Sequence, residues 1–123
     1  MTQSVDHGTV VTRLLGADDI LILCHKNPDG DTIGSGAALC LALQRLGKTA
    51  AVLCSDPIPA MYDFLPITEF DGSYTPRFVV AVDVAGIQLF GDRNHMADYA
   101  GHVDLCIDHH GSNSGYAYET LVD

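Results

Sequence analysis

Short apolar segments alternate with segments of helical spacing along this chain of 123 residues. Residues 20–24 and 78–82 carry no polar side chain, which is typical of strands buried on both faces of a sheet. Segments 48–54, 103–107 and 116–122 also favour strands. Helical spacing is found in segments 4–15 and 33–46 and, over part of their length, in 60–65 and 89–100. This order of elements predicts an α/β fold with an open, mostly parallel sheet and helices on both of its faces.

The helical segment 33–46 is rich in alanine and leucine and is bounded by residues that favour helix ends. Thr32 can cap its amino end, because its hydroxyl can accept a hydrogen bond from a free backbone N–H group. Gly47 can end the helix, because glycine adopts the left-handed conformation at little cost. We therefore expect a helix that follows directly on the polar turn at residues 25–31.

Three of the apolar segments end in side chains that bind metal ions. These side chains are His25, Asp29 and Asp31 after the first segment, Asp83 after the second, and Asp108, His109 and His110 after the third. The carboxyl ends of parallel strands open onto one edge of a sheet, so these side chains should converge on one crevice. Imidazole together with carboxylate oxygens suits manganese, zinc or iron better than calcium. The sequence therefore predicts a divalent metal centre at this edge.

Each motif also has a purely structural interpretation. Asn27-Pro28-Asp29-Gly30 on its own favours a tight turn, Asp83 could cap a strand end, and residues 108–110 could form an exposed loop. We favour the metal centre because all three motifs follow apolar strands. For the other side chains we expect structural roles: His7, His95 and His102 exposed, and Tyr62, Phe64 and Phe70 packed in a peripheral loop rather than stacked on bases.

Length and charge narrow the class of partner. A chain of 123 residues supports one domain with a genuine core. The formal charge of −10 argues against binding of long duplex nucleic acid, which requires basic surfaces. A small phosphorylated substrate remains compatible with this charge, because bound cations would reverse its sign locally.

The cysteines and the apolar segments bear on location. All four cysteines lie in apolar segments without a C-x-x-C pair, which favours buried, reduced thiols and a cytoplasmic protein. No apolar run is long enough to cross a membrane, and the first residues lack the basic and apolar regions of a signal peptide. We therefore expect no membrane partner.

The three motifs together resemble those of the DHH phosphoesterases. The first is His25-x-Asn27-Pro28-Asp29-Gly30-Asp31, the second is Asp83, and the third is Asp108-His109-His110-x-Ser112-Asn113. They are most similar to the branch of oligoribonucleases and 3′-phosphoadenosine-5′-phosphate phosphatases, with RecJ-type exonucleases as relatives. The resemblance implies a Rossmann-like DHH domain that binds two Mn²⁺ ions, with Mg²⁺ or another divalent ion as the alternative.

The resemblance also implies roles for single residues. His25 and Asp29 would bind one ion, Asp31 and His109 would bind the other, and Asp83 would bridge the two.

The residues around the ions would act on the substrate. Asp83, Asp108 and His110 would form the catalytic set, with Asp108 orienting the neighbouring imidazole. His110, together with Ser35, Ser112 and Asn113, would contact the substrate. Ser35 lies near the start of the helix after the first motif, where free N–H groups favour an anion.

Members of this family usually contain a fourth metal aspartate and a carboxyl-terminal substrate-binding domain. We expect residues 1–123 to form a DHH catalytic domain that ends before both, with Leu89 at a position where related members often have arginine. Apolar surface at the docking site of a second domain would allow two copies of the chain to associate as a homodimer.

The expected activity is manganese-dependent hydrolysis of short oligonucleotides or nucleoside bisphosphates by a water that two metal ions activate. Two alternatives stay open: a truncated, non-catalytic metal-binding domain, and an inorganic pyrophosphatase or exopolyphosphatase of the same superfamily.

Overall fold

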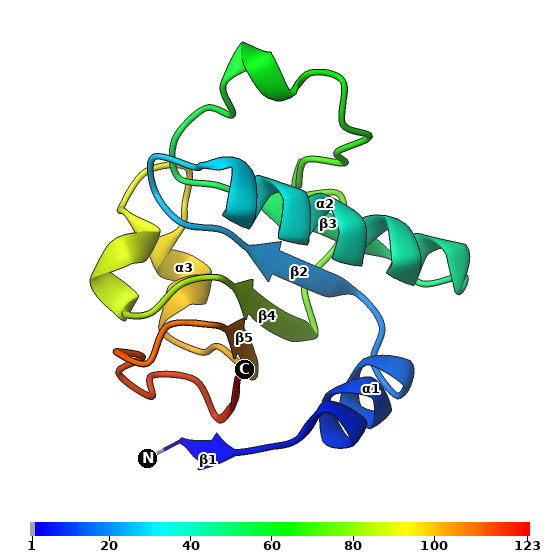
Figure 1. Cartoon of the computed structure of the whole chain (residues 1–123). Coiled ribbons are helices and arrows are strands. Elements are labelled where there is room, and N and C mark those ends of the chain that lie inside the picture. The colour runs from blue at the N-terminus through cyan, green and yellow to red at the C-terminus, as the bar shows by residue number, and fades with distance from the viewer. Residues whose placement is uncertain (1) are drawn as a thin grey trace.

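Six parallel strands form the sheet at the centre of the protein (Figure 1). The computed structural model describes residues 2–123. The strands are β1 (Gln3–Ser4), β2 (Ile20–Leu23), β3 (Ala50–Leu53), β4 (Phe78–Val82), β5 (Leu105–Asp108) and β6 (Glu119–Val122). Their order across the sheet is β1-β6-β5-β4-β2-β3, and each neighbouring pair is parallel. The predicted α/β fold with a parallel sheet is confirmed.

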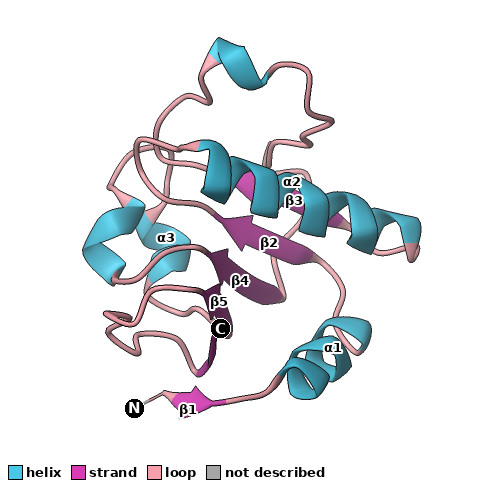
Figure 2. Cartoon of the chain, viewed as in Figure 1, coloured by secondary structure: helices cyan, strands magenta, loops and turns pink. Residues whose placement is uncertain are grey.

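Helices cover both faces of this sheet (Figure 2). They are α1 (His7–Leu15), α2 (Gly30–Arg45) and α3 (Ala97–Ala100), with the short 3₁₀ helices η1 (Ala60–Tyr62) and η2 (Ile87–Phe90). On one face, α1 and α2 pack against Ile20 and Ile22 of β2. On the other face, η2 and α3 pack against Leu21 and Leu23 of the same strand. Successive strand residues point to opposite faces, so one apolar strand serves both cores.

Helix α2 lies unusually close to the central strand. A Cβ atom at Gly36 would lie 2.9 Å from the Sγ atom of Cys24, the residue directly after β2. A larger residue would push the helix away from the sheet, at a cost of roughly 1–3 kcal/mol. Cys24 is fully buried, and the other three cysteines are buried and free as well, as predicted.

The observed elements differ from the predicted ones mainly at their ends. The helix predicted for residues 4–15 begins at His7, because Asp6 caps it by accepting a hydrogen bond from the Thr9 N–H group (2.8 Å). Gln3 and Ser4 instead form β1, which the sequence did not predict. Phe64 is 78% exposed, so the expectation that it packs in its loop was wrong. No helix in the described part of the chain is long and apolar enough to span a membrane.

The strand order places a crevice beside β2. After β2 the chain runs to β3 on one side and later to β4 on the other side. The loops that leave the carboxyl ends of β2 and β4 therefore diverge, and a parallel sheet binds its ligands at such a point.

Candidate metal centre

Four side chains from the ends of β4 and β5 meet at the carboxyl edge of the sheet. Asp83, Asp108, His109 and His110 each offer one possible ligand atom, and these atoms lie within 4.8 Å of one another. The two strand ends are joined directly, because the Asp83 N–H group donates to the carbonyl oxygen of Ile107 (2.9 Å). The predicted convergence of the second and third motifs is thus present in the structure.

Asp83 is held in a costly state. It is 8% exposed, and its φ of 61° lies in the left-handed region, which is uncommon for a residue with a side chain. Its Oδ1 atom is buried without a hydrogen bond, although Nδ1 of His109 lies only 2.7 Å away. Burial raises the pKa of Asp83, and the neighbouring His109 and His110 offset part of this effect.

This arrangement fits a divalent cation. A buried carboxylate oxygen and an imidazole nitrogen are in contact without the alignment of a hydrogen bond. A cation bound by both atoms would satisfy the oxygen that the protein leaves without a partner. Imidazole and carboxylate donors suit manganese, zinc and iron. Asp83 and His109 are therefore the residues of this cluster that would hold the ion.

Asp108 is satisfied by the protein itself. Its Oδ1 atom accepts hydrogen bonds from Nδ1 of His110 (2.6 Å) and from the backbone N–H group of His109 (2.8 Å). Its Oδ2 atom accepts one from Nδ2 of Asn113 (2.9 Å). Burial pushes the pKa of Asp108 upward, but these hydrogen bonds outweigh it and leave the pKa below its usual value. Asp108 therefore orients the imidazole of His110 and raises its pKa.

Asn113 is tied into the same loop on both sides of its amide. While Nδ2 bonds to Asp108, the Oδ1 atom accepts from the N–H group of Gly115 (2.8 Å). In the structure the Asn113 side chain therefore holds Asp108. That Asn113 contacts the substrate stays a prediction. Ser112 and, on α2, Ser35 are exposed, as substrate contacts would need to be.

The first motif lies at the same edge but outside the four-residue cluster. Asp29 is the N-cap of α2, and its Oδ1 atom accepts from the N–H group of Thr32 (3.0 Å). The prediction of Thr32 as the cap was therefore wrong. Asp31 is exposed in the first turn of α2, and Nδ1 of His25 contacts the backbone oxygen of Lys26. That His25, Asp29 and Asp31 bind metal stays a prediction.

Thr32 instead connects the first and second motifs. It is fully buried, and its hydroxyl donates to the carbonyl oxygen of Val82 (3.2 Å) and accepts from the N–H group of His25 (3.3 Å). The residue before Asp83 is thereby fixed to the residue that opens the first motif. The sequence signal for this role is a hydroxyl residue on the buried face of the first helical turn.

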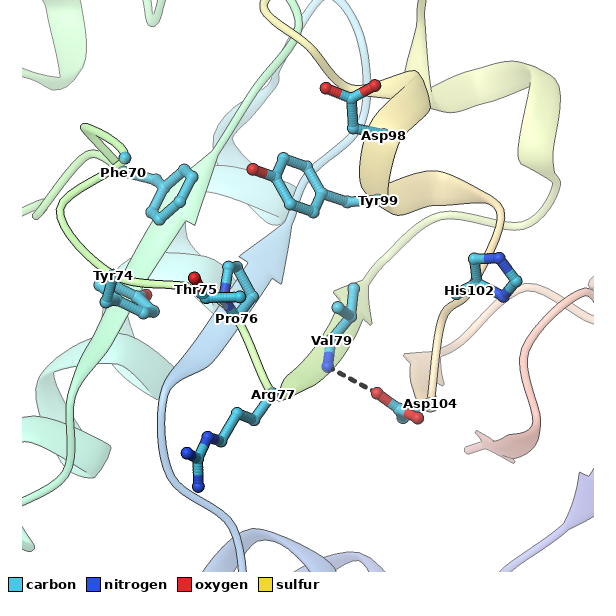
Figure 3. A pocket seen from close by; sticks show the side chains of 11 residues that line it. Phe70, Tyr74, Thr75, Pro76, Arg77, Val79, Asp98, Tyr99, His102 and Asp104 are labelled. Carbon is cyan, nitrogen blue, oxygen red and sulfur yellow. Dashed lines mark hydrogen bonds between the residues drawn. The ribbon is translucent and has the colours of Figure 1, made fainter.

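A hollow at the opposite edge of the sheet offers a contrast. It has a volume of about 500 Å³ and is lined by Phe70, Tyr74 and Tyr99 (Figure 3). The carboxylate of Asp104 in its wall accepts a hydrogen bond from the N–H group of Val79 (2.8 Å). Among the described residues, no buried side-chain oxygen or nitrogen atom that lines this hollow lacks a hydrogen bond. The hollow therefore offers no counterpart of the buried Oδ1 atom of Asp83.

The fold and the cluster define a class: α/β proteins that present carboxylates and imidazoles at the carboxyl edge of a parallel sheet. Residues 19–122 match the model of the DHH family, N-terminal domain. The chain belongs to the DHH family, as its motifs indicated.

Two known proteins are similar to this chain. The bifunctional oligoribonuclease and PAP phosphatase NrnA of Thermus thermophilus is 33% identical over 115 residues, which cover 85% of this chain and 32% of that protein. The chain thus spans about a third of the length of this relative. The crystal structure of an exopolyphosphatase-related protein from Bacteroides fragilis matches with a TM-score of 0.70 at 20% identity, over 93% of this chain and 38% of that one. The second likeness supports the fold alone.

Proposed function

We propose that this domain is the catalytic domain of a manganese-dependent phosphoesterase that hydrolyses short oligonucleotides or nucleoside bisphosphates. The observation that carries the proposal is the cluster of Asp83, Asp108, His109 and His110, with the Oδ1 atom of Asp83 buried and without a hydrogen bond. Membership of the DHH family and the similarity to a protein named as an oligoribonuclease and PAP phosphatase support it. The cytoplasmic location and the homodimer stay predictions.

The residues of the cluster have two different proposed roles, metal binding and contact with the substrate. Asp83 and His109 would hold a divalent ion, together with His25, Asp29 and Asp31 if the first motif completes the site. Such ions supply an activated water and neutralise the charge of the phosphate group. Asp108 accepts a hydrogen bond from Nδ1 of His110, which leaves the Nε2 atom of His110 to face the substrate.

His110 can therefore act on the phosphate or on the leaving group. Its side chain is 40% exposed, and its hydrogen bond to Asp108 raises its pKa, so the protonated form persists to higher pH. A protonated imidazole would donate a hydrogen bond from Nε2 to a phosphate oxygen or to the departing oxygen. Asp108 keeps the ring in the orientation that this step requires.

A hollow beside the first motif would accommodate the rest of a nucleotide. It has a volume of about 510 Å³ and lies between Lys26 and Asn27 on one side and Gln88 on the other. Among the described residues, Lys26 forms no ion pair, whereas Arg93 at the same hollow is paired with Asp56. In a protein with a formal charge of −10, this free ammonium group would favour a second phosphate of the substrate.

The proposal is tested by hydrolysis with purified protein and Mn²⁺. A diribonucleotide, a nucleoside 3′,5′-bisphosphate and inorganic pyrophosphate are offered in parallel, with Asp83→Asn as the control variant. Faster release of nucleotide product by the wild type than by the variant supports the proposal. Preference for pyrophosphate would instead favour an inorganic pyrophosphatase. Metal binding with hydrolysis equal to that of the variant would show a non-catalytic domain.

A further inference from the structure

Ser55 and Asp56, which follow β3 and Cys54, connect two loops that carry the candidate site. The Oδ2 atom of Asp56 accepts a hydrogen bond from the backbone N–H group of Asn27 in the loop after β2 (2.8 Å). The Oγ atom of Ser55 accepts one from the N–H group of Arg93 in the segment after η2 (2.8 Å). No metal-ligand pattern in the sequence singles out either residue.

The contact with Asn27 falls at a residue of the first motif that has a left-handed backbone. Asn27 lies between His25 and Asp29 and has a φ of 49°, in the left-handed region. The preceding N–H group, that of Lys26, donates to the carbonyl oxygen of Leu89 (2.7 Å). Two successive N–H groups therefore fix the path of the loop from outside. The acceptor at Asn27 is a carboxylate, which forms a stronger hydrogen bond than a neutral oxygen does.

Asp56 is itself held in place. Its side chain is 22% exposed, and its Oδ1 atom lies 3.7 Å from Nη1 of Arg93. The segment of Arg93 is pressed against Ser55, since a Cβ atom at Gly91 would lie 2.6 Å from the Ser55 Oγ atom. Gly91 has a φ of 81°, which glycine adopts without strain. The carboxylate of Asp56 is thus presented to Asn27 by a closely packed support.

We infer that Asp56 is a positioning residue of the metal centre: its carboxylate fixes the backbone between His25 and Asp29 and so preorganises these two side chains. This inference rests on the proposed function, which takes both residues as metal ligands. Asp56 acts on these ligands through the Asn27 N–H group and is not itself one of the proposed metal ligands. Outer residues that orient metal ligands commonly change metal affinity by about 10–100-fold when they are replaced.

The first test uses metal-free protein and hydrogen exchange. In Asp56→Ala the Asn27 amide loses its acceptor, and we expect it to exchange at least about tenfold faster, while amides in the middle of α2 stay unchanged. Asp92→Asn is the matched control, because Asp92 lines the same hollow and is exposed, and no hydrogen bond of its side chain is found among the described residues. Unchanged protection of Asn27 in Asp56→Ala overturns the inference.

The second test measures the affinity for Mn²⁺ alone by titration calorimetry. We expect Asp56→Ala to raise the Kd for Mn²⁺ about tenfold, and Asp92→Asn to change it less than twofold. Asp56→Asn keeps an oxygen that can accept the hydrogen bond from Asn27, so it should retain most of the affinity for Mn²⁺. This variant also keeps the test decisive if Asp56→Ala folds poorly. Equal Kd values for wild type, Asp56→Asn and Asp56→Ala overturn the inference. A wild type that binds no Mn²⁺ refutes the proposed function instead, while the exchange experiment still decides on Asp56.

Discussion

The two edges of the sheet use aspartates in opposite ways. At the amino edge, Asp104 accepts a hydrogen bond from the Val79 N–H group (2.8 Å), and the Tyr74 hydroxyl donates to the carbonyl oxygen of Ile20 (2.6 Å). At the carboxyl edge, Asp83 is more deeply buried, adopts a left-handed backbone and keeps Oδ1 without a hydrogen bond. At the amino edge the carboxylate of Asp104 is paired with the backbone, whereas the carboxyl edge retains a buried carboxylate oxygen that forms no hydrogen bond among the described residues.

The hydrogen bonding of the aspartates distinguishes the two edges of the sheet, whereas the size of their hollows does not. The two edges have hollows of nearly equal size, about 500 and 510 Å³. An unsatisfied buried carboxylate costs roughly 1–3 kcal/mol, and a protein retains such a cost where a function requires it. The comparison predicts that substitutions at the two edges will separate activity from stability.

The largest effect is expected for Asp83→Asn. The variant should lose at least about 1,000-fold in kcat/KM, because a proposed metal ligand and its charge are removed. The same change should stabilise the metal-free protein by about 1 kcal/mol, since burial disfavours the charge of this carboxylate by more than the neighbouring imidazoles offset. Hydrolysis assays and urea unfolding measure the two effects. A loss of activity together with a loss of stability would contradict the contrast between the edges.

A smaller loss is expected for Asn113→Ala. Without the amide, Asp108 keeps its bond to His110 but loses the hydrogen bond to its Oδ2 atom, so the orientation of the imidazole relaxes. We expect kcat to fall about 10–100-fold with KM changed little. Asn94→Ala is a suitable control, because within residues 2–123 the side-chain amide of Asn94 bonds only to the backbone oxygen of Cys54 (3.1 Å). Equal kinetics of the two variants would refute the role of Asn113.

At the amino edge, Asp104→Asn should behave in the opposite manner. The variant weakens the charged hydrogen bond to Val79, so we expect it to lower the free energy of unfolding by about 1 kcal/mol. The Kd for Mn²⁺ and the rate of hydrolysis should stay within twofold of the wild type. Chemical unfolding and calorimetry give both values, and weaker metal binding would show that the two edges are coupled.

The smallest effect concerns pH. Arg13 of α1 donates hydrogen bonds to both carboxylate oxygens of Glu119, the first residue of β6 (2.7 and 3.0 Å). This ion pair lowers the pKa of Glu119 below 4.5. A carboxyl group whose pKa is lowered on folding stabilises the protein at pH values above its pKa in the unfolded state. This stabilisation is lost as the pH falls through the lowered pKa of the folded state. The fall in stability below about pH 4.5 should therefore be shallower for Glu119→Gln than for wild type. Parallel curves in acid unfolding would disprove this contribution.

The sequence predicted the features that depend on local pattern. The apolar runs of β2 and β4 identified buried strands, and the polar residues after them identified the edge that carries the site. The contacts formed between distant residues escaped prediction. β1 consists of Gln3 and Ser4, whose strand conformation depends on pairing with β6, and nothing local favours it. Asp56 carries no motif, and its role follows from its position opposite Asn27.

The ends of helices and strands were harder to predict for a related reason. Asp29 and Thr32 are both good capping residues, and the choice between them depends on Thr32 being drawn into the core beneath Val82. Strand β5 extends to Asp108, because its register with β6 continues to Val122. Such ends are decided by packing partners that lie far away in the sequence.

The pairing of β1 with β6 has a consequence for biosynthesis. Gln3 lies beside Glu119, so β1 cannot form its strand until β6, which lies far further along the chain, has been synthesised. Until then β6 and its neighbours offer no docking edge, and the nascent segment stays without its partner strand. Contacts of such high sequence separation slow folding, so this border of the sheet should be completed late.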